Sequence, residues 1–274
     1  MEKMKFIKIS FIVCILLLCI IFIQTKLNAV EINQLIDIPT AAVVRKGNYQ
    51  IDTRLFTNGG VLLRGEIGLA ERFNLGISYG GVKIISEENP EWNPNVAIDA
   101  KYRLSDGGVG YPAIGVGYDG QGYGLYNKKD ERYRNKSKGL YMVLSHEYKP
   151  VGEMHVGTNY SFEDKDDKSG NVFLGINRWI GPEIMAMADY DLGLNDDDKQ
   201  GKTKNNYTYK TYGSGKGYLN AGIRWYFAPE LVLEFNVLNI TRNGKKELDD
   251  DKVSRIIKIS YTNYFDFSGG SHGK

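Results

Sequence analysis

The sequence predicts an all-β fold: a single antiparallel up-and-down transmembrane β-barrel of about 12 strands, preceded by a signal peptide. Apolar residues alternate with polar or small residues over a long series of segments, which is the period of strands with one apolar face. The connections alternate between tight turns and long polar loops, as in membrane barrels. The composition, with 32 Gly and 19 Tyr but only 7 Pro, suits strands with an aromatic face and a small-residue face.

Residues 1–29 have the layout of a secretory signal peptide. The first eight residues include three lysines, an apolar run follows over residues 9–23, and Ala29 supplies a small residue before a cleavage site. The run is short for a membrane-spanning helix, so an uncleaved anchor is the weaker interpretation. Both cysteines, Cys14 and Cys19, fall in this segment. The mature chain is therefore expected to use no disulfide, thiolate or cysteine-ligated metal.

The rest of the chain is predicted to comprise a periplasmic N-terminal segment (residues 30–47), the barrel (48–267) and a C-terminal tail (268–274). Residues 1–29 hold four of the 35 basic and one of the 33 acidic side chains, which leaves a formal net charge of −1 for the mature chain. A near-neutral chain gives no case for nucleic-acid binding.

Twelve segments follow the alternating pattern. They cover residues 48–56, 61–69, 73–80, 96–104, 114–119, 140–149, 154–163, 172–180, 184–190, 219–227, 231–237 and 257–267. Most have about nine to eleven residues, the length that a tilted strand needs to cross a bilayer.

The tight turns predict the orientation of the barrel. Three of them, residues 70–72, 181–183 and 228–230, share one three-residue format between flanking apolar residues, and residues 105–110 and 150–152 form two more. An odd number of linking residues keeps the apolar faces of both strands on the same side. Every even-numbered strand except the last thus ends in a tight turn, whereas most odd-numbered strands end in a long polar loop. This asymmetry predicts that the turns and both termini lie in the periplasm.

A soluble sandwich or soluble barrel would show the same alternation. Two features favour lipid as the environment of the apolar face. Charged residues of both signs occupy mid-strand positions on the opposite face, as in a wet lumen. Aromatic residues gather near both strand ends, for example Trp179, Trp225 and Phe227 beside turns and Tyr79 and Tyr118 near loops, as in the interfacial girdles of membrane barrels.

The charged face gives the candidate site. Residues expected to line the lumen, and therefore candidates for solute binding, are Asp52, Arg54, Arg64, Glu66, Asp99, Lys101, Arg103, Glu147, His155, Arg224 and Glu234. We expect no catalytic residue, no metal and no cofactor.

Two motifs imitate ligand sites without meeting their requirements. The run Gly115-x-Gly117-x-x-Gly120 fits a dinucleotide fingerprint, but a polar loop follows where that fingerprint needs a helix. The run from Asp196 begins like a calcium loop, but Tyr207 stands where a bidentate Glu belongs. The glycine run is better interpreted as small residues inside a narrow barrel, and the run from Asp196 as part of a solvated loop.

His155 is the one residue that suggests catalysis. Outer-membrane phospholipases would require a serine two residues after the histidine, and Gly157 stands there instead. The spacing indicates no pair of nucleophile and base, so an outer-membrane enzyme is the least favoured of three functional alternatives.

One part of the chain resembles a known family. The run Leu35-Ile36-Asp37-Ile38-Pro39-Thr40-Ala41-Ala42, followed by Gly47 and by Gly68-Leu69-Ala70-Glu71-Arg72-Phe73-Asn74-Leu75-Gly76, is similar to the opening of YjbH-like proteins. These are outer-membrane barrels associated with exopolysaccharide production, and the resemblance covers about residues 35–104. It implies a non-enzymatic barrel in the outer membrane of a Gram-negative-type bacterium, where it assists polysaccharide export or surface assembly.

The implied partners are outer-membrane lipid and polysaccharide or its export proteins. The last strand ends on alternating Tyr261, Phe265 and Phe267, similar to the strand that such barrels present to the barrel assembly machinery. A wide polysaccharide conduit would need aromatic side chains along its inner wall, and the sequence offers only a few inward candidates, Tyr141, Phe173 and Tyr226. A narrow general pore for small solutes is therefore the main alternative.

Overall fold

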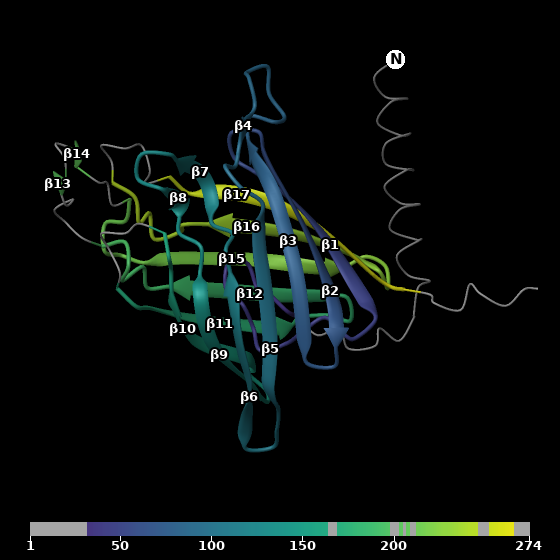
Figure 1. The fold of residues 1–274 in the computed structure, drawn as a ribbon. Coiled ribbons are helices and arrows are strands. Elements are labelled where there is room, and N and C mark those ends of the chain that lie inside the picture. Colours follow the sequence, from purple (N-terminus) through teal and green to yellow (C-terminus); the bar gives the residue numbers. More distant parts are fainter. Residues whose placement is uncertain are drawn as a thin grey trace, which may run out of the picture. The chain divides into compact units, whose positions relative to one another are not determined.

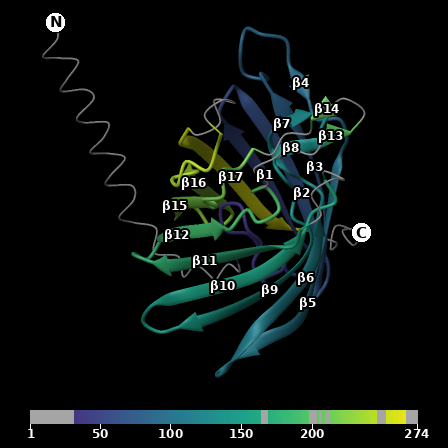
Figure 2. The ribbon, with the colours of Figure 1, turned by 90° about the vertical axis from the view of Figure 1, so that its left-hand side faces the viewer.

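Twelve long antiparallel strands close into one barrel in the computed structural model (Figures 1 and 2). The structure describes residues 32–163, 169–197, 203–204, 207–208, 212–245 and 252–265. The barrel strands are β1 (Asn48–Phe56), β2 (Gly60–Ala70), β3 (Phe73–Val82), β5 (Ala97–Gly108), β6 (Tyr111–Asp119), β9 (Gly139–Tyr148), β10 (Gly152–Tyr160), β11 (Asn171–Trp179), β12 (Ile184–Asp191), β15 (Tyr218–Tyr226), β16 (Leu231–Leu238) and β17 (Ser254–Tyr264). Each pairs with the next, and β17 pairs with β1 to close the sheet.

Five short strands lie in the long connections. β4 (Glu91–Trp92) extends the edge of β3, β7 (Tyr123–Asn127) pairs with β8 (Arg132–Asn135), and β13 (Thr203–Lys204) pairs with β14 (Tyr207–Thr208). All of these connections belong to the end of the barrel opposite the tight turns, called here the loop end. Among the described residues, no helix is long and apolar enough to cross a membrane.

The structure confirms the predicted fold class, and all twelve predicted segments overlap a barrel strand. One hairpin differs from the prediction. Residues 105–110 were expected to form a turn, but β5 continues to Gly108 and pairs with Tyr111 of β6. A register shift between Arg103 and Ser105 marks a bulge, after which pairing resumes. As a result β5 and β6 project beyond their neighbours at the turn end (Figure 1).

Alternation places apolar side chains outside the barrel and polar ones inside. Along β2, Arg64 and Glu66 on one face are buried, whereas Leu63 on the opposite face is 52% exposed. Ile77 on β3 and Phe235 on β16 are 57% and 53% exposed. The outer wall is thus an apolar belt around a polar interior.

The interior is not empty, because residues 32–44 fold back inside it. Of these thirteen residues, all except Ala42 are buried. The segment forms a small hairpin in which Leu35 N donates to Ile38 O (3.0 Å) and Thr40 N donates to Asn33 O (3.2 Å). We call residues 32–44 the plug. Figure 2 shows this purple segment enclosed by the strands.

The plug alters the expected division of the chain. Residues 30–47 were predicted to form a periplasmic N-terminal segment, and the structure places residues 32–44 of that segment within the lumen. The link to β1 leaves at the turn end, where Gly47 N donates to Gly68 O (2.9 Å). The periplasmic side of this end stays a prediction.

Candidate functional site

Charged side chains from neighbouring strands form ion pairs along the inner wall. Glu234 Oε1 lies 2.9 Å from Arg224 Nη2 and 3.7 Å from Lys258 Nζ, and that lysine lies 3.4 Å from Asp52 Oδ2. On the opposite side of β1, Arg64 Nη2 lies 3.1 Å from Asp119 Oδ2. The strand register places these groups side by side, since Arg224 is paired with Glu234 and Glu234 with Lys258. Buried charges in such a wall must be paired to be tolerated.

The acidic part of this wall binds backbone N–H groups of the plug. Asp189 Oδ2 on β12 accepts hydrogen bonds from Ile36 N (3.1 Å) and Asp37 N (2.8 Å). Ser145 Oγ on β9 accepts one from Ala41 N (2.9 Å). These acceptors satisfy plug N–H groups that a short hairpin cannot pair internally.

The basic part of the wall binds plug carbonyl groups. Arg224 Nη2 donates to Gln34 O (2.8 Å), and Lys101 Nζ donates to Ala42 O (3.1 Å) and also to Asn33 O. Arg54 Nη1 donates to Ile36 O (3.3 Å) and forms an ion pair with Asp37. The charges predicted to meet a solute therefore hold the chain's own N-terminal segment.

Two glycines leave room for the apolar side chains of the plug. A Cβ atom at Gly175 on β11 would lie 2.5 Å from Leu35 Cδ1 and 2.6 Å from Ile38 Cδ1. A Cβ atom at Gly115 on β6 would lie 2.9 Å from Ala41 Cα. Any larger residue at these positions would push against the plug, which gives both glycines a packing role.

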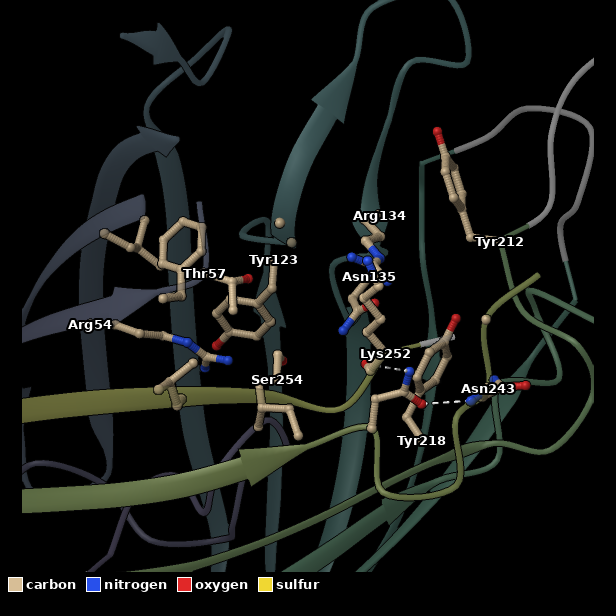
Figure 3. Close-up of a pocket in the computed structure, with 18 of the residues that line it drawn as sticks. Arg54, Thr57, Tyr123, Arg134, Asn135, Tyr212, Tyr218, Asn243, Lys252 and Ser254 are labelled. Carbon is tan, nitrogen blue, oxygen red and sulfur yellow. Dashed lines mark hydrogen bonds between the residues drawn. The ribbon is translucent and has the colours of Figure 1, made fainter. Parts of the chain in front are cut away.

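The plug separates two cavities. The one at the turn end has a volume of about 630 Å³ and borders Val43 of the plug together with Arg103 and Asp106. The one at the loop end has a volume of about 70 Å³ and borders Arg54, the residue that holds the plug tip. We call the second cavity the loop-end cavity (Figure 3).

Arg54 and Tyr123 form the floor of the loop-end cavity. The guanidinium carbon of Arg54 lies 3.9 Å from the centroid of the Tyr123 ring, a cation–π contact. Burial raises the pKa of the Tyr123 phenol, so that the ring stays neutral. Its hydroxyl also accepts a hydrogen bond from Gln34 Nε2 (2.8 Å) and so contacts the plug.

Buried polar contacts fasten the loops that surround this cavity. Arg132, which is fully buried, lies 2.7 Å from Asp196 Oδ1, and Tyr218 Oη donates to Asp196 Oδ2 (2.8 Å). Glu163 accepts backbone N–H groups from Tyr133 (2.8 Å) and Ser137 (2.9 Å), and burial raises the pKa of its carboxyl group. Asp196 was the first residue of the calcium-like motif, and its carboxylate is buried among these contacts and does not face solvent as a solvated loop would.

A serine, a histidine and an asparagine meet in the lumen wall. His155 Nδ1 lies 2.7 Å from Ser145 Oγ, and Nε2 lies 2.7 Å from Asn177 Oδ1. The partner considered in the sequence was a serine two residues after His155 on the same strand, whereas Ser145 faces His155 across the β9–β10 pair. All three are buried, and the same Ser145 oxygen already accepts a plug N–H. Through Ser145 the group contacts the plug.

Most of the predicted site residues lie together inside the barrel. Nine are buried there: Asp52, Arg54, Arg64, Glu66, Asp99, Lys101, His155, Arg224 and Glu234. Arg103 is largely buried at the turn end, where it borders the turn-end cavity. Glu147 differs from the prediction, since its side chain is 64% exposed beside the β9–β10 turn, past the last lumen position of that strand. Solute binding by the set stays a prediction.

Several residues of the site were absent from the predicted set. They are Asp119, Ser145, Asn177, Asp189, Asn220 and Lys258. All have the inward phase of their strands, so alternation alone would have included them. Within the described residues, no group of three or more His, Cys, Asp or Glu side chains is placed to hold a metal ion.

Comparisons with known proteins find distant structural similarity alone. No protein-family model matches the chain, and no curated protein matches it. The structure is similar to the KdgM porin, with 9% sequence identity, coverage of 80% of this chain and 99% of that chain, and a TM-score of 0.46. It is similar to the NanC porin, with 9% identity, 80% and 100% coverage and a TM-score of 0.43. It is also similar to outer membrane phospholipase A from Escherichia coli, with 14% identity, 81% and 93% coverage and a TM-score of 0.35.

Proposed function

We propose that this protein is a non-enzymatic outer-membrane β-barrel that conducts small polar solutes and that its lumen is closed by the plug. The observation that carries this proposal is the set of contacts between the charged lumen wall and the backbone of residues 32–44. Asp189, Arg224 and Lys101 each bind main-chain atoms of the plug.

The outer wall fits a lipid environment. Large apolar side chains with more than a third of their surface exposed occur around the barrel, for example Leu63, Ile77, Ile98, Leu140 and Phe235. Such a continuous apolar belt is far larger than the patches that monomeric soluble proteins expose. A closed barrel pairs every strand edge, so its backbone needs no water inside a bilayer. The expected signal peptide and the turn-to-loop asymmetry support the outer membrane as the location.

The inner wall fits a channel for small polar solutes. Paired charges of both signs line it along several strands, and two cavities lie at the two ends of the plug. A barrel of twelve strands encloses limited space, and its inward side chains narrow that space further. Removal of thirteen residues from the lumen would connect the cavities, whereas the ion pairs of the wall would stay in place.

The two other functions have less support. The residues that carry the resemblance to YjbH-like proteins include 35–42, which form most of the plug, and a role in polysaccharide export stays a prediction. The inward aromatic residues Tyr141, Phe173 and Tyr226 are buried and offer no open platform to a sugar chain. An enzyme is disfavoured because the Ser145 and His155 pair lies beneath the plug.

Planar-bilayer recordings test the proposal. The wild-type protein is compared with a variant in which residues 32–44 are replaced by a Gly/Ser linker of equal length. We expect few openings from the wild type and steady single-channel steps from the variant. Heat-dependent gel mobility verifies that each barrel is folded. A folded linker variant that stays electrically silent would refute the channel, and a wild-type protein that fractionates as a soluble one would refute membrane insertion.

A further inference from the structure

The lumen wall binds the plug chiefly through the main chain of the plug. The wall acceptors Asp189 and Ser145 bind N–H groups. The wall donors Arg224, Lys101 and Arg54 bind carbonyl groups. All but the serine are charged, and a hydrogen bond with one charged partner is about twice as strong as a neutral one. Main-chain groups are the same in every peptide, so the same wall residues can bind a peptide of another sequence.

The tip of the plug shows how the wall matches one residue of a peptide. Ile36 N donates to Asp189 Oδ2 (3.1 Å), while Ile36 O accepts from Arg54 Nη1 (3.3 Å). Lys101 Nζ donates to a carbonyl oxygen in each of the two arms of the plug hairpin. Donors and acceptors of the wall are thus placed for both polar groups of a peptide main chain.

The side chains of the plug add simpler requirements. Leu35 and Ile38 fill the space over Gly175, where a Cβ atom would lie 2.5 and 2.6 Å from their methyl carbons. Other apolar side chains of similar size can fill the same space. The polar side chains of the plug that bind the rest of the described chain are Asn33, Gln34 and Asp37. The site therefore suits a peptide with an apolar residue over Gly175, and it does not require one exact sequence.

We propose that the lumen binds short peptides through their main chain when the plug is displaced, and that short peptides are the solute class of the channel. The plug occupies this site as a tethered peptide that is part of the chain itself. The inference rests on the proposed function, because it requires a plug that can leave the lumen, and it names the solute class that the proposed channel admits.

The tether predicts how strongly the plug competes with a free peptide. A tethered segment acts at a high effective concentration, so a free peptide should bind the wild-type protein far more weakly than a protein without the plug. A Gly/Ser linker in place of residues 32–44 is a poor competitor. Glycine loses the most conformational freedom when it is ordered, and it has no side chain for the space over Gly175.

Equilibrium binding tests the site without any transport measurement. Fluorescence anisotropy follows labelled peptides on the detergent-purified linker variant, and a variant with residues 32–44 deleted repeats the measurement without any tethered chain. One peptide has the sequence of residues 32–44, the second has the same composition in scrambled order, and the third is the first peptide N-methylated at Ile36, Asp37 and Ala41. N-methylation removes the N–H groups that Asp189 and Ser145 bind.

We expect saturable binding of the first two peptides, with affinities within about tenfold of each other, and binding of the N-methylated peptide at least about tenfold weaker than that of the first. Failure of the scrambled peptide to bind would show recognition of one sequence and overturn the proposal. Equal binding of the N-methylated and unmodified peptides would overturn it as well.

Two controls separate the lumen from other binding sites. The wild-type protein, in which the plug fills the lumen, should bind each peptide at least about tenfold more weakly than the linker variant. Equal binding by the two proteins would place the peptide outside the lumen and overturn the proposal. Maltotriose, an uncharged trisaccharide, should not displace the labelled peptide, and displacement by an equal concentration would overturn the assignment to peptides.

Two conservative changes in the linker variant locate the site on the wall. Asp189→Asn replaces charge-assisted hydrogen bonds to the main chain by neutral ones, so we expect about tenfold weaker binding of the scrambled peptide. Asp99→Asn makes the same change at a buried inward carboxylate that has no hydrogen bond to the described plug residues, and its affinity should be unchanged. Equal affinities of these two variants would place the peptide elsewhere and overturn the assignment.

The inference and the proposed function fail in different ways. A linker variant that binds peptides but stays electrically silent would refute the channel alone. A linker variant that conducts but binds neither the plug sequence nor the scrambled peptide would refute this inference alone.

Discussion

Asp37 Oδ1 lies 2.7 Å from Arg54 Nη1, and this buried ion pair joins the tip of the plug to the wall of the barrel. Asn220 Nδ2 also donates to Asp37, at 3.3 Å, so the carboxylate is held from two strands. The pair lies at the boundary between the plug and the loop-end cavity, which Arg54 borders.

Asp37→Asn should therefore open the channel more often. Loss of the carboxylate leaves Arg54 buried without its ionic partner, which destabilises the plugged state by about 3 kcal/mol. Single-channel recordings should show a higher open probability than the wild type. Asp106→Asn is the matched control, because Asp106 pairs with Arg72 at an exposed site near the β5–β6 turn. An open probability that changes equally in both variants would contradict a specific role for Asp37.

Gly175→Val should displace the plug by steric pressure. The new side chain would occupy the space of the Leu35 and Ile38 methyl groups, while valine itself suits a β-strand. We expect a folded barrel with raised conductance. Gly65→Val on β2 is the control, because no atom lies within 4 Å of a Cβ built there. A Gly175→Val barrel as silent as the wild type would show that the plug does not block the lumen.

Ser145→Ala should loosen the plug without affecting any chemistry. The change removes the acceptor of Ala41 N, a loss of about 1 kcal/mol or slightly more because that N–H is buried. A modest rise in open probability is expected. Phospholipid hydrolysis should be absent from the wild type and from the variant alike. Hydrolysis by the wild type that Ser145→Ala abolishes would identify an enzyme and contradict the anchoring role.

Ile77→Lys should impair insertion into lipid. Ile77 is 57% exposed on the outer wall, and a lysine facing the bilayer midplane costs about 2–4 kcal/mol. Folding into lipid vesicles, followed by heat-dependent gel mobility, measures the effect. Val109→Lys at the fully exposed tip of the β5–β6 hairpin should insert like the wild type. Normal insertion of the Ile77→Lys variant would argue against the lipid belt.

The strands could be predicted because the alternation of apolar and polar residues reflects the environment of each strand face. Leu63 and Arg64 differ in burial for the same reason that they differ in polarity. The extension of β5 through residues 105–108 was missed, because this glycine-containing stretch lacks apolar alternation and pairs through its backbone alone.

The plug could not be predicted from the same pattern. Its contacts with Asp189, Arg224 and Ser145 use main-chain atoms of residues 34–41, and main-chain groups are the same in every sequence. The apolar Leu35 and Ile38 fit against a glycine of a distant strand, which only the closed barrel brings near. The Ser145 and His155 pair could have been predicted from the sequence. The two residues lie the same number of positions before and after Pro150, in the turn that sets the register of the hairpin.

A reversible cross-link between plug and wall tests most directly whether the plug closes the channel. A Cβ atom at Gly115 would lie 3.5 Å from Ala41 Cβ, within the range that a disulfide spans, so Ala41→Cys with Gly115→Cys forms the pair. Single-channel currents are recorded before and after reductant, with the cross-link verified by mass. We predict silence in the oxidised state and openings after reduction. The side chain added at position 115 crowds the plug, which is free to leave the lumen once the disulfide is reduced. Equal currents in the two states would contradict the account.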